Sequence, residues 1–294
     1  MATVGQWIAG ARLRTLTMAI SPVIVGSAAA FDLGSFRWEY ALIALGIALL
    51  LQIGVNYAND YSDGVRGTDD KRVGPLRLTA SGAASPGAVK TAAFVCFGLA
   101  MLLGLLLVVL TQTWPLLLVG VACVVAAWGY TGGKNPYGYL GLGDVFVFIF
   151  FGLVATLGTT YTQAGRLGTV ACIGAICCGL FAMALLMANN VRDIPTDRAV
   201  GKKTLAVRLG DSAARLAFVM MLGAAILLPL ILVGTHPWVL LVLLLIPVCL
   251  IPAWVMLRAS SPEALIPVLK QTGVASLLFA VLYSGGVVLT RVLS

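Results

Sequence analysis

Two stretches of this sequence place asparagine and aspartate at helical spacing, each at the end of a long apolar run. The first acidic station comprises Asn56, Asp60 and Asp63, at positions i, i+4 and i+7. The second acidic station comprises Asn189, Asp193 and Asp197, at positions i, i+4 and i+8. Either spacing stacks its three side chains on one face of a helix. The two stations are therefore candidates for one shared site.

Carboxylate and carboxamide oxygens are hard ligands that suit Mg²⁺, which usually shares its coordination shell with substrate phosphates. An aspartate at the centre of a bilayer is disfavoured by roughly 2.5–3.5 kcal/mol, and four acids converging on one cavity would also repel each other. A bound divalent cation removes that repulsion. Each station is followed by a basic loop, and Lys and Arg side chains hold phosphate oxygens. The pattern predicts a clamp for magnesium and a diphosphate.

A third segment, from Trp128 to Asp144, carries Tyr130 and Lys134 in a YxxxK pattern after another apolar run. It is not a phosphate-binding P-loop, because Asn135 follows Lys134 and the first glycine of that motif is missing. A glycine-rich turn with a loop lysine is the competing interpretation. We keep both residues as candidates because the segment should lie on the same face as the two stations.

The elements that must position these residues are membrane helices. The mean hydropathy is +1.02, 60% of the 294 residues are hydrophobic and only 10% are charged, against about 25% charged in soluble domains. Apolar runs lie near 14–31, 39–59, 89–110, 113–130, 140–161, 169–190, 213–234, 237–257 and 272–292. Each approaches the roughly 20 residues that cross a bilayer. We predict an all-α polytopic membrane protein with nine transmembrane helices.

The distribution of Lys and Arg predicts the orientation. With a cytoplasmic N-terminus, nine helices leave only Arg37, Arg166 and Arg291 outside, and the other sixteen of the 19 basic residues fall inside. This asymmetry follows the positive-inside rule and predicts a cell-membrane protein with its C-terminus outside. The net charge of +8 then suits anionic lipid or an anionic substrate, and no nucleic-acid-binding motif is present.

The stations also suggest an internal repeat. Asp60 and Asp193 lie 133 positions apart, each at the end of an apolar run four runs from the other. We predict a single domain over residues 1–294, built as two four-helix units, roughly 12–138 and 139–270, plus one helix. Both stations and the YxxxK segment would then face a central cavity on the cytoplasmic side.

At these residues the chain resembles the UbiA family of intramembrane aromatic prenyltransferases. The matching motifs are NDYSD (Asn59–Asp63), GPLRLTASG (Gly74–Gly82), YTGGK (Tyr130–Lys134), NNVRDIPTD (Asn189–Asp197) and GKKTLAVRLG (Gly201–Gly210), in the family's order. The stretches ARLRTLTMAISPVIVGSA (Ala11–Ala28) and NPYGYLGLGD (Asn135–Asp144) look most like the branch of menaquinone biosynthesis that prenylates 1,4-dihydroxy-2-naphthoate.

The resemblance implies a magnesium-dependent transfer from a polyprenyl diphosphate to 1,4-dihydroxy-2-naphthoate, with loss of diphosphate and CO₂, giving demethylmenaquinone. Implied metal ligands are Asn56, Asn59, Asp60, Asp63, Asn189, Asp193 and Asp197. Many relatives carry a further aspartate where this chain has Gly67, and the later Asp69 is an additional candidate ligand. Implied diphosphate-binding residues are Arg66, Arg72, Arg77, Arg192, Lys202 and Lys203. The four station aspartates, Tyr130 and Lys134 are the catalytic candidates.

Two alternatives keep part of this interpretation. The same enzyme class could use another acceptor, such as 4-hydroxybenzoate, because one or two side chains can retune an acceptor pocket. A cation-coupled transporter would also combine internal repeats with membrane carboxylates. Transporters tend to place such groups near the midplane, whereas the middles of all nine apolar runs are uncharged here.

Overall fold

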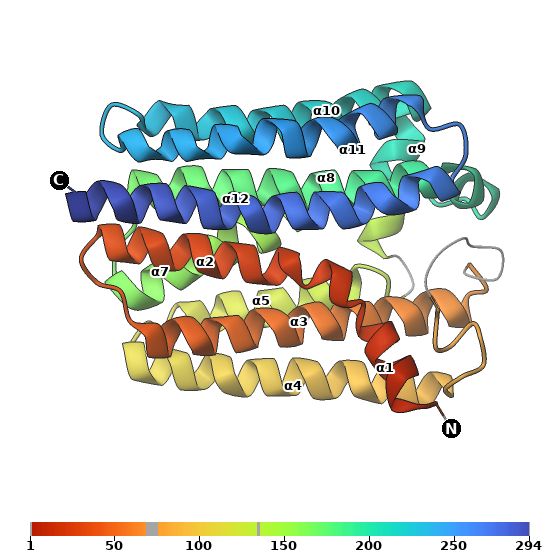
Figure 1. Ribbon diagram of the computed structural model, residues 1–294. Helices are drawn as coiled ribbons and strands as arrows, with labels where there is room; N and C mark the ends of the chain where they lie inside the picture. Colours follow the sequence, from red (N-terminus) through yellow and green to blue (C-terminus); the bar gives the residue numbers. More distant parts are fainter. Residues whose placement is uncertain (1, 69–75, 134–135, 294) are drawn as a thin grey trace.

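The structure of the protein is a computed structural model that describes residues 2–68, 76–133 and 136–293. Every regular element in these ranges is helical. The long helices lie side by side in one bundle, and the N-terminus and C-terminus lie at opposite ends of it (Figure 1). The prediction of an all-α membrane protein is confirmed, and opposite ends are what an odd number of crossings would give.

Most of the predicted spans form long helices, because their apolar residues continue for four turns or more. Long unbroken helices are α3 (Trp38–Val65), α4 (Pro86–Thr111), α8 (Thr169–Ala199) and α12 (Ile266–Leu293), and α2 (Thr17–Asp32) is a shorter one. Two others continue from one helix type into another: α10 (Asp211–Leu227) into η4 (Leu228–Leu232), and η5 (Pro237–Leu245) into α11 (Ile246–Arg258). Short elements are α1 (Val4–Ala11), η1 (Leu13–Thr15), η2 (Tyr137–Leu140), α9 (Leu205–Leu209) and η6 (Glu263–Leu265).

The number of spans differs in part from the expected nine. Seven described helices are long and apolar enough to cross a membrane, and an eighth is formed if α1–η1 and α2, bent by 50°, count as one span. The run near 113–130 forms α5 (Leu116–Gly129), a shorter apolar helix of 14 residues. At about 1.5 Å per residue, α5 alone reaches only about two thirds of the way across a 30 Å hydrocarbon layer.

The span over 143–164 begins with α6 (Gly143–Val147), continues as the π-helical segment η3 (Phe148–Val154) and ends with α7 (Ala155–Ala164). Glycine permits η3 to pack closely on α8, since a Cβ on Gly152 would lie 2.5 Å from the Cα of Gly179. Small residues at such crossings let helix backbones approach within van der Waals contact in membranes. The π-helical turn, a form common near functional sites, carries Phe150 and Phe151 into the central cavity.

The bundle has two packed groups. In the first, α2, α8, α10, α11 and α12 surround the largest apolar core, which contains Phe181, Phe218 and Phe279. In the second, α3 packs along α4, and Tyr57 and Phe97 lie in their shared core. α8 carries the second station and α3 the first, so the arrangement places the two stations on helices of different groups.

Candidate active site

A cavity of about 580 Å³ lies between the two groups and is lined from α1, η1, α2, α3, α5, η3 and α8, with two residues near the start of α12. Among the residues that the structure describes, five cationic side chains and three carboxylates line it, a net charge of +2. These are Arg12, Arg14, Arg77, Arg192 and Lys202, with Asp63, Asp193 and Asp197. The remaining lining is mainly apolar and aromatic. A cavity of this kind suits a ligand with an anionic head and an apolar body.

The first station reaches the cavity through Asp63. Its carboxylate is 7% exposed, accepts a hydrogen bond of 2.8 Å from the Tyr139 hydroxyl and lies 3.9 Å from the Arg77 guanidinium. Asn59, one turn earlier on α3, also lines the cavity and accepts a 2.7 Å hydrogen bond from the Thr131 hydroxyl. Carbonyl and carboxylate oxygens from α3 thus face the cavity at its polar end.

Asp60 does not line the cavity, in contrast to the expectation that it would face the same site. The side chain is fully buried, and its two carboxylate oxygens accept hydrogen bonds of 2.8 Å from the backbone amides of Leu78 and Thr79. The loop at 76–82 is therefore attached to α3 through Asp60. Because Arg77 belongs to this loop, Asp60 indirectly places the cation that contacts Asp63.

Asn56 lines the cavity, but its side-chain amide forms hydrogen bonds to the bend between α1 and α2. Its Nδ2 donates to the Ala11 carbonyl at 2.9 Å and to the Thr15 hydroxyl at 3.0 Å, and its Oδ1 lies 3.5 Å from Gln52 Nε2. These bonds give Asn56 a structural task, and its role as a metal ligand stays a prediction. The helical spacing placed it on the correct face of α3, and the partners from η1 could not be foreseen.

The second station lies on α8, and all three of its predicted residues line the cavity. Arg192 holds Asp193 through two bonds of 2.7 Å, one to each carboxylate oxygen, and also donates to Asn189 Oδ1 at 2.6 Å. Asp197, 7% exposed, lies 3.6 Å from the Lys202 ammonium. Each carboxylate of the cavity therefore has a cation of the predicted diphosphate set beside it.

Tyr139 connects the two stations and was not among the predicted site residues. It belongs to η2, its hydroxyl donates to Asp63, and the Lys202 ammonium lies 5.0 Å from the centre of its ring. Burial, followed by the nearby Asp63 carboxylate, raises the pKa of Tyr139 well above its usual value. The hydroxyl therefore stays protonated as a donor at neutral pH. From the sequence, Tyr139 was only part of the matching stretch NPYGYLGLGD (Asn135–Asp144) and had no role assigned to it.

The remaining predicted cations are placed differently. Arg66 donates to the carbonyls of Thr131 and Gly133, so it fixes the turn after α5. The Lys203 side chain is exposed and does not line the cavity. Tyr130 does line it, with its ring against Tyr137. Three predictions lie outside the described residues: Asp69, Arg72 and Lys134.

The donor chemistry of the cavity fits a magnesium ion. Within the described ranges, no three acidic, histidine or cysteine side chains already converge as a complete ligand set. This agrees with the ion pairs, because each carboxylate is turned toward a cation. The carboxylates of Asp63, Asp193 and Asp197 and the amides of Asn59 and Asn189 nevertheless supply only hard oxygen and carboxamide donors to one cavity. Mg²⁺ completes its shell with water and phosphate oxygens, so few protein ligands suffice.

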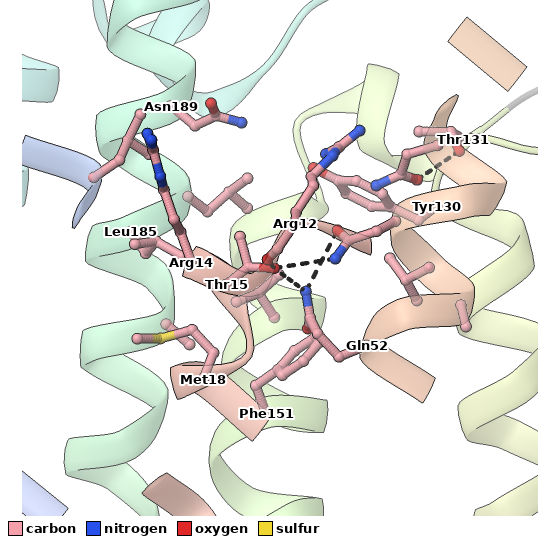
Figure 2. Close-up of a pocket in the computed structure, with 18 of the residues that line it drawn as sticks. Arg12, Arg14, Thr15, Met18, Gln52, Tyr130, Thr131, Phe151, Leu185 and Asn189 are labelled. Atoms are coloured by element: carbon pink, nitrogen blue, oxygen red, sulfur yellow. Dashed lines mark hydrogen bonds between the residues drawn. The ribbon is translucent and has the colours of Figure 1, made fainter. Parts of the chain in front are cut away.

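Sequence reasoning also missed a group at the break between α1 and α2. Arg12, Arg14 and Thr15 line the cavity there, and Gln52 of α3 donates to Thr15 at 3.0 Å. Figure 2 shows both arginine side chains reaching toward the polar end, Arg14 toward Asn189 and Arg12 toward the side of Tyr130. The sequence had assigned these arginines only to the orientation of the chain in the membrane.

A membrane-embedded helical bundle with carboxylates and cations around one apolar cavity defines an intramembrane transferase for isoprenoid diphosphates. The chain belongs to the UbiA prenyltransferase family, whose pattern matches residues 19–279. The predicted family membership is thus confirmed, and the chain is an integral membrane prenyltransferase.

Two relatives carry the name 1,4-dihydroxy-2-naphthoate octaprenyltransferase. The protein from Mycobacterium tuberculosis is 48% identical over 97% of this chain and 97% of its own length. The protein from Escherichia coli is 39% identical over 97% of this chain and 96% of its own length. The naphthoate branch indicated by the flanking motifs is the one to which these relatives belong.

Solved structures share the fold. A UbiA homolog from Aeropyrum pernix, in its apo state, superposes with a TM-score of 0.69 at 17% identity, covering 95% of this chain and 99% of that chain. A UbiA homolog from Archaeoglobus fulgidus, bound to GPP and Mg²⁺, gives a TM-score of 0.67 at 15% identity, covering 96% and 99%. At these identities the likeness concerns the fold.

Proposed function

We propose that this chain transfers a polyprenyl group from polyprenyl diphosphate to 1,4-dihydroxy-2-naphthoate, as the names of its relatives describe for them. The observation that carries the proposal is the cavity itself. Carboxylates and cations of two stations meet at one end, and an apolar, aromatic chamber adjoins them. An isoprenoid diphosphate has the same division between a charged head and an apolar tail.

The polar end binds the diphosphate. Arg77, Arg192 and Lys202 line the cavity beside the station aspartates. A guanidinium has five N–H donors, so an arginine that holds a carboxylate keeps donors for phosphate oxygens. These cations stabilise negative charge on the leaving diphosphate as the carbon–oxygen bond of the substrate breaks.

Mg²⁺, held by Asp63, Asp193 and Asp197 with Asn59 and Asn189, would neutralise the diphosphate and lower the barrier to its departure. We assign Asp60 a positioning role instead, because its oxygens bind the loop amides. The described residues that line the cavity carry a net charge of +2. A prenyl diphosphate and an acceptor carboxylate together bring about −4, so one Mg²⁺ balances the charge of the loaded site.

The apolar chamber protects the allylic cation that remains. Phe150 and Phe151 from η3 and Leu185 from α8 belong to its lining, and exclusion of water prevents capture of the cation as an alcohol. The ring carbon that bears the carboxylate attacks the cation, and a carbon–carbon bond forms at that position. The bond to the carboxyl carbon breaks, CO₂ leaves, and the electron pair of that bond returns to the ring. The product is a prenylated naphthoquinol, the reduced form of demethylmenaquinone.

We further propose nine membrane crossings, with α5 as a short span and α1–η1–α2 as a bent one. The proposed N-terminus is cytoplasmic and the C-terminus outside the cell membrane. The distribution of basic residues supports this orientation, as does the position of the two termini at opposite ends of the bundle (Figure 1).

Product analysis on purified, detergent-solubilised protein tests the function. Octaprenyl diphosphate would be supplied with 1,4-dihydroxy-2-naphthoate or with 4-hydroxybenzoate, and the products identified by mass spectrometry. We expect a prenylated naphthoquinol that has lost the carboxyl group, from the naphthoate alone. A prenylated 4-hydroxybenzoate that retains its carboxyl group would overturn the acceptor while keeping the enzyme class. Absence of product from either acceptor in folded protein would refute the proposal.

A further inference from the structure

We propose that Arg14 binds the carboxylate of the aromatic acceptor and thereby selects acid-bearing rings. The inference rests on the proposed function, and it assigns a residue to the half of the reaction that the two acidic stations do not address. It follows from how the break between α1 and α2 is built, from the charges that surround it, and from its depth in the cavity.

Specific hydrogen bonds hold the bend between α1 and α2. Arg12 ends α1 in the left-handed region at φ 53°, which is unfavourable for a residue with a Cβ. The chain then bends by 50° into α2. Thr15 donates to the Arg12 carbonyl at 2.9 Å and accepts from Gln52 and Asn56 at 3.0 Å each (Figure 2). Strained backbone persists only where the surroundings impose it, and here α3 imposes it.

The bend places Arg14 at the cavity: the residue is exposed and its side chain belongs to the cavity lining. Three of the other lining cations each hold a station aspartate, and Arg12 also has an interaction partner. For the Arg14 guanidinium, no hydrogen bond or ion pair is found among the residues of 2–68, 76–133 and 136–293. A guanidinium that lines a cavity and holds no carboxylate of its own keeps all its N–H donors for an anionic ligand.

The depth of the break separates it from the diphosphate end. It is attached to α3 at Gln52 and Asn56, which precede Asp63 by eleven and seven residues. At about 1.5 Å per residue these anchors lie about 10–16 Å along the helix from Asp63. From there the Arg14 side chain reaches toward Asn189, so it spans the zone between the apolar chamber and the charged end (Figure 2).

The neighbourhood of Arg14 suits a flat ring with an acid at its edge. Met18, Phe151 and Leu185 line the same part of the cavity and supply thioether, aromatic and aliphatic surface (Figure 2). A guanidinium matches a carboxylate through two parallel hydrogen bonds, which fixes orientation as well as position. Held in this way, the ring would face the allylic carbon as diphosphate leaves from the stations above it.

The decisive comparison uses inhibitors that differ only by the carboxylate. The inhibition constants of 1-hydroxy-2-naphthoate and 1-naphthol against naphthoate turnover would be measured for wild type, Arg14→Gln and Arg14→Lys. We expect Arg14→Gln to weaken the acid about 10- to 100-fold, the usual value of a hydrogen bond to a charged group, and to leave 1-naphthol within twofold. Arg14→Lys, which keeps the charge but not the paired geometry, should fall between.

Kinetics with each substrate varied distinguish the carboxylate from a phosphate. We expect Arg14→Gln to raise KM for the naphthoate and to leave KM for octaprenyl diphosphate within twofold, as in Arg258→Gln, a matched loss of charge on the exposed surface of α11. A rise confined to the diphosphate would assign Arg14 to the other substrate and overturn the inference. An unchanged ratio of inhibition constants would do the same. If the wild-type protein does not turn over the naphthoate, the proposed function is refuted. If the wild-type protein is active but the ratio of inhibition constants does not change in the variants, only the role of Arg14 is refuted. Should Arg14→Gln not fold, Arg14→Lys provides the same ratio.

Discussion

Substitution of Asp60, whose carboxylate is buried, distinguishes a positioning role from metal binding. Asp60→Asn keeps the size of the side chain, retains one acceptor oxygen and turns an NH₂ group toward the other backbone amide. The change removes one hydrogen bond to a charged group and thereby leaves a buried N–H without an acceptor. This loss is worth about 1.5–3 kcal/mol. Both amides, of Leu78 and Thr79, are held at 2.8 Å in the intact protein.

We therefore expect the loop at 76–82 to lose about 1.5–3 kcal/mol of local stability. Its open population would rise about 10- to 100-fold, and hydrogen exchange at the amides of Leu78 and Thr79 would accelerate by the same factor. Exchange read out by mass spectrometry on peptides covering this loop measures the effect. Asp211→Asn, which removes an exposed carboxylate paired with Arg215, is the control and should leave these amides unchanged.

Activity measurements complete the Asp60 test. Loop opening displaces Arg77, so KM for the polyprenyl diphosphate should rise while the Mg²⁺ concentration for half-maximal activity stays within about twofold. Asp63→Asn should instead raise that Mg²⁺ concentration at least tenfold, since one hydrogen-bonding or ligating interaction with a charged group is worth at least about 1.4 kcal/mol. A Mg²⁺ requirement shifted as far by Asp60→Asn as by Asp63→Asn, with exchange at the loop unaltered, would refute the positioning role.

Two further predictions concern the support of the site. Tyr139→Phe removes the 2.8 Å hydrogen bond to Asp63 and keeps the ring; we expect kcat/KM to fall about 10- to 100-fold, and steady-state rates equal to wild type would contradict this. Gly26→Ala places a Cβ 2.5 Å from the Thr156 carbonyl oxygen, whereas Gly223→Ala meets nothing within 4 Å. The first should destabilise the protein by about 1–3 kcal/mol and lower the midpoint of its thermal unfolding; equal midpoints for the two variants would show that α2 and α7 can separate freely.

The parts of this structure that sequence predicts well are those governed by local rules. Long apolar runs fixed the positions of the main helices, because a membrane helix satisfies its own backbone and needs only length and hydrophobicity. Helical spacing placed Asp63, Asp193 and Asp197 on cavity-facing surfaces. The predicted pairing of acids with downstream cations also appears, in the contact of Asp197 with Lys202.

The parts that sequence misses depend on partners distant along the chain. Asp60 shares a helix with Asp63, yet a loop 18 residues away covers its carboxylate. Asn56 donates a hydrogen bond to Thr15, which lies 41 residues earlier in the bend between α1 and α2. In the sequence, Arg14 is one of many basic residues that follow the positive-inside rule. In the structure, hydrogen bonds from α3 to the neighbouring Thr15 place Arg14 at the cavity. Periodicity gives a face of a helix, and only tertiary structure shows what meets that face.

Carboxyl release tests the central claim most directly. Purified protein would receive octaprenyl diphosphate and 1,4-dihydroxy-2-naphthoate labelled in the carboxyl group, with Mg²⁺ or with EDTA, and labelled CO₂ and free diphosphate would be counted together. The account predicts equal amounts of both products with Mg²⁺ and neither with EDTA. Diphosphate released without CO₂, or CO₂ released at full rate in EDTA, would contradict it.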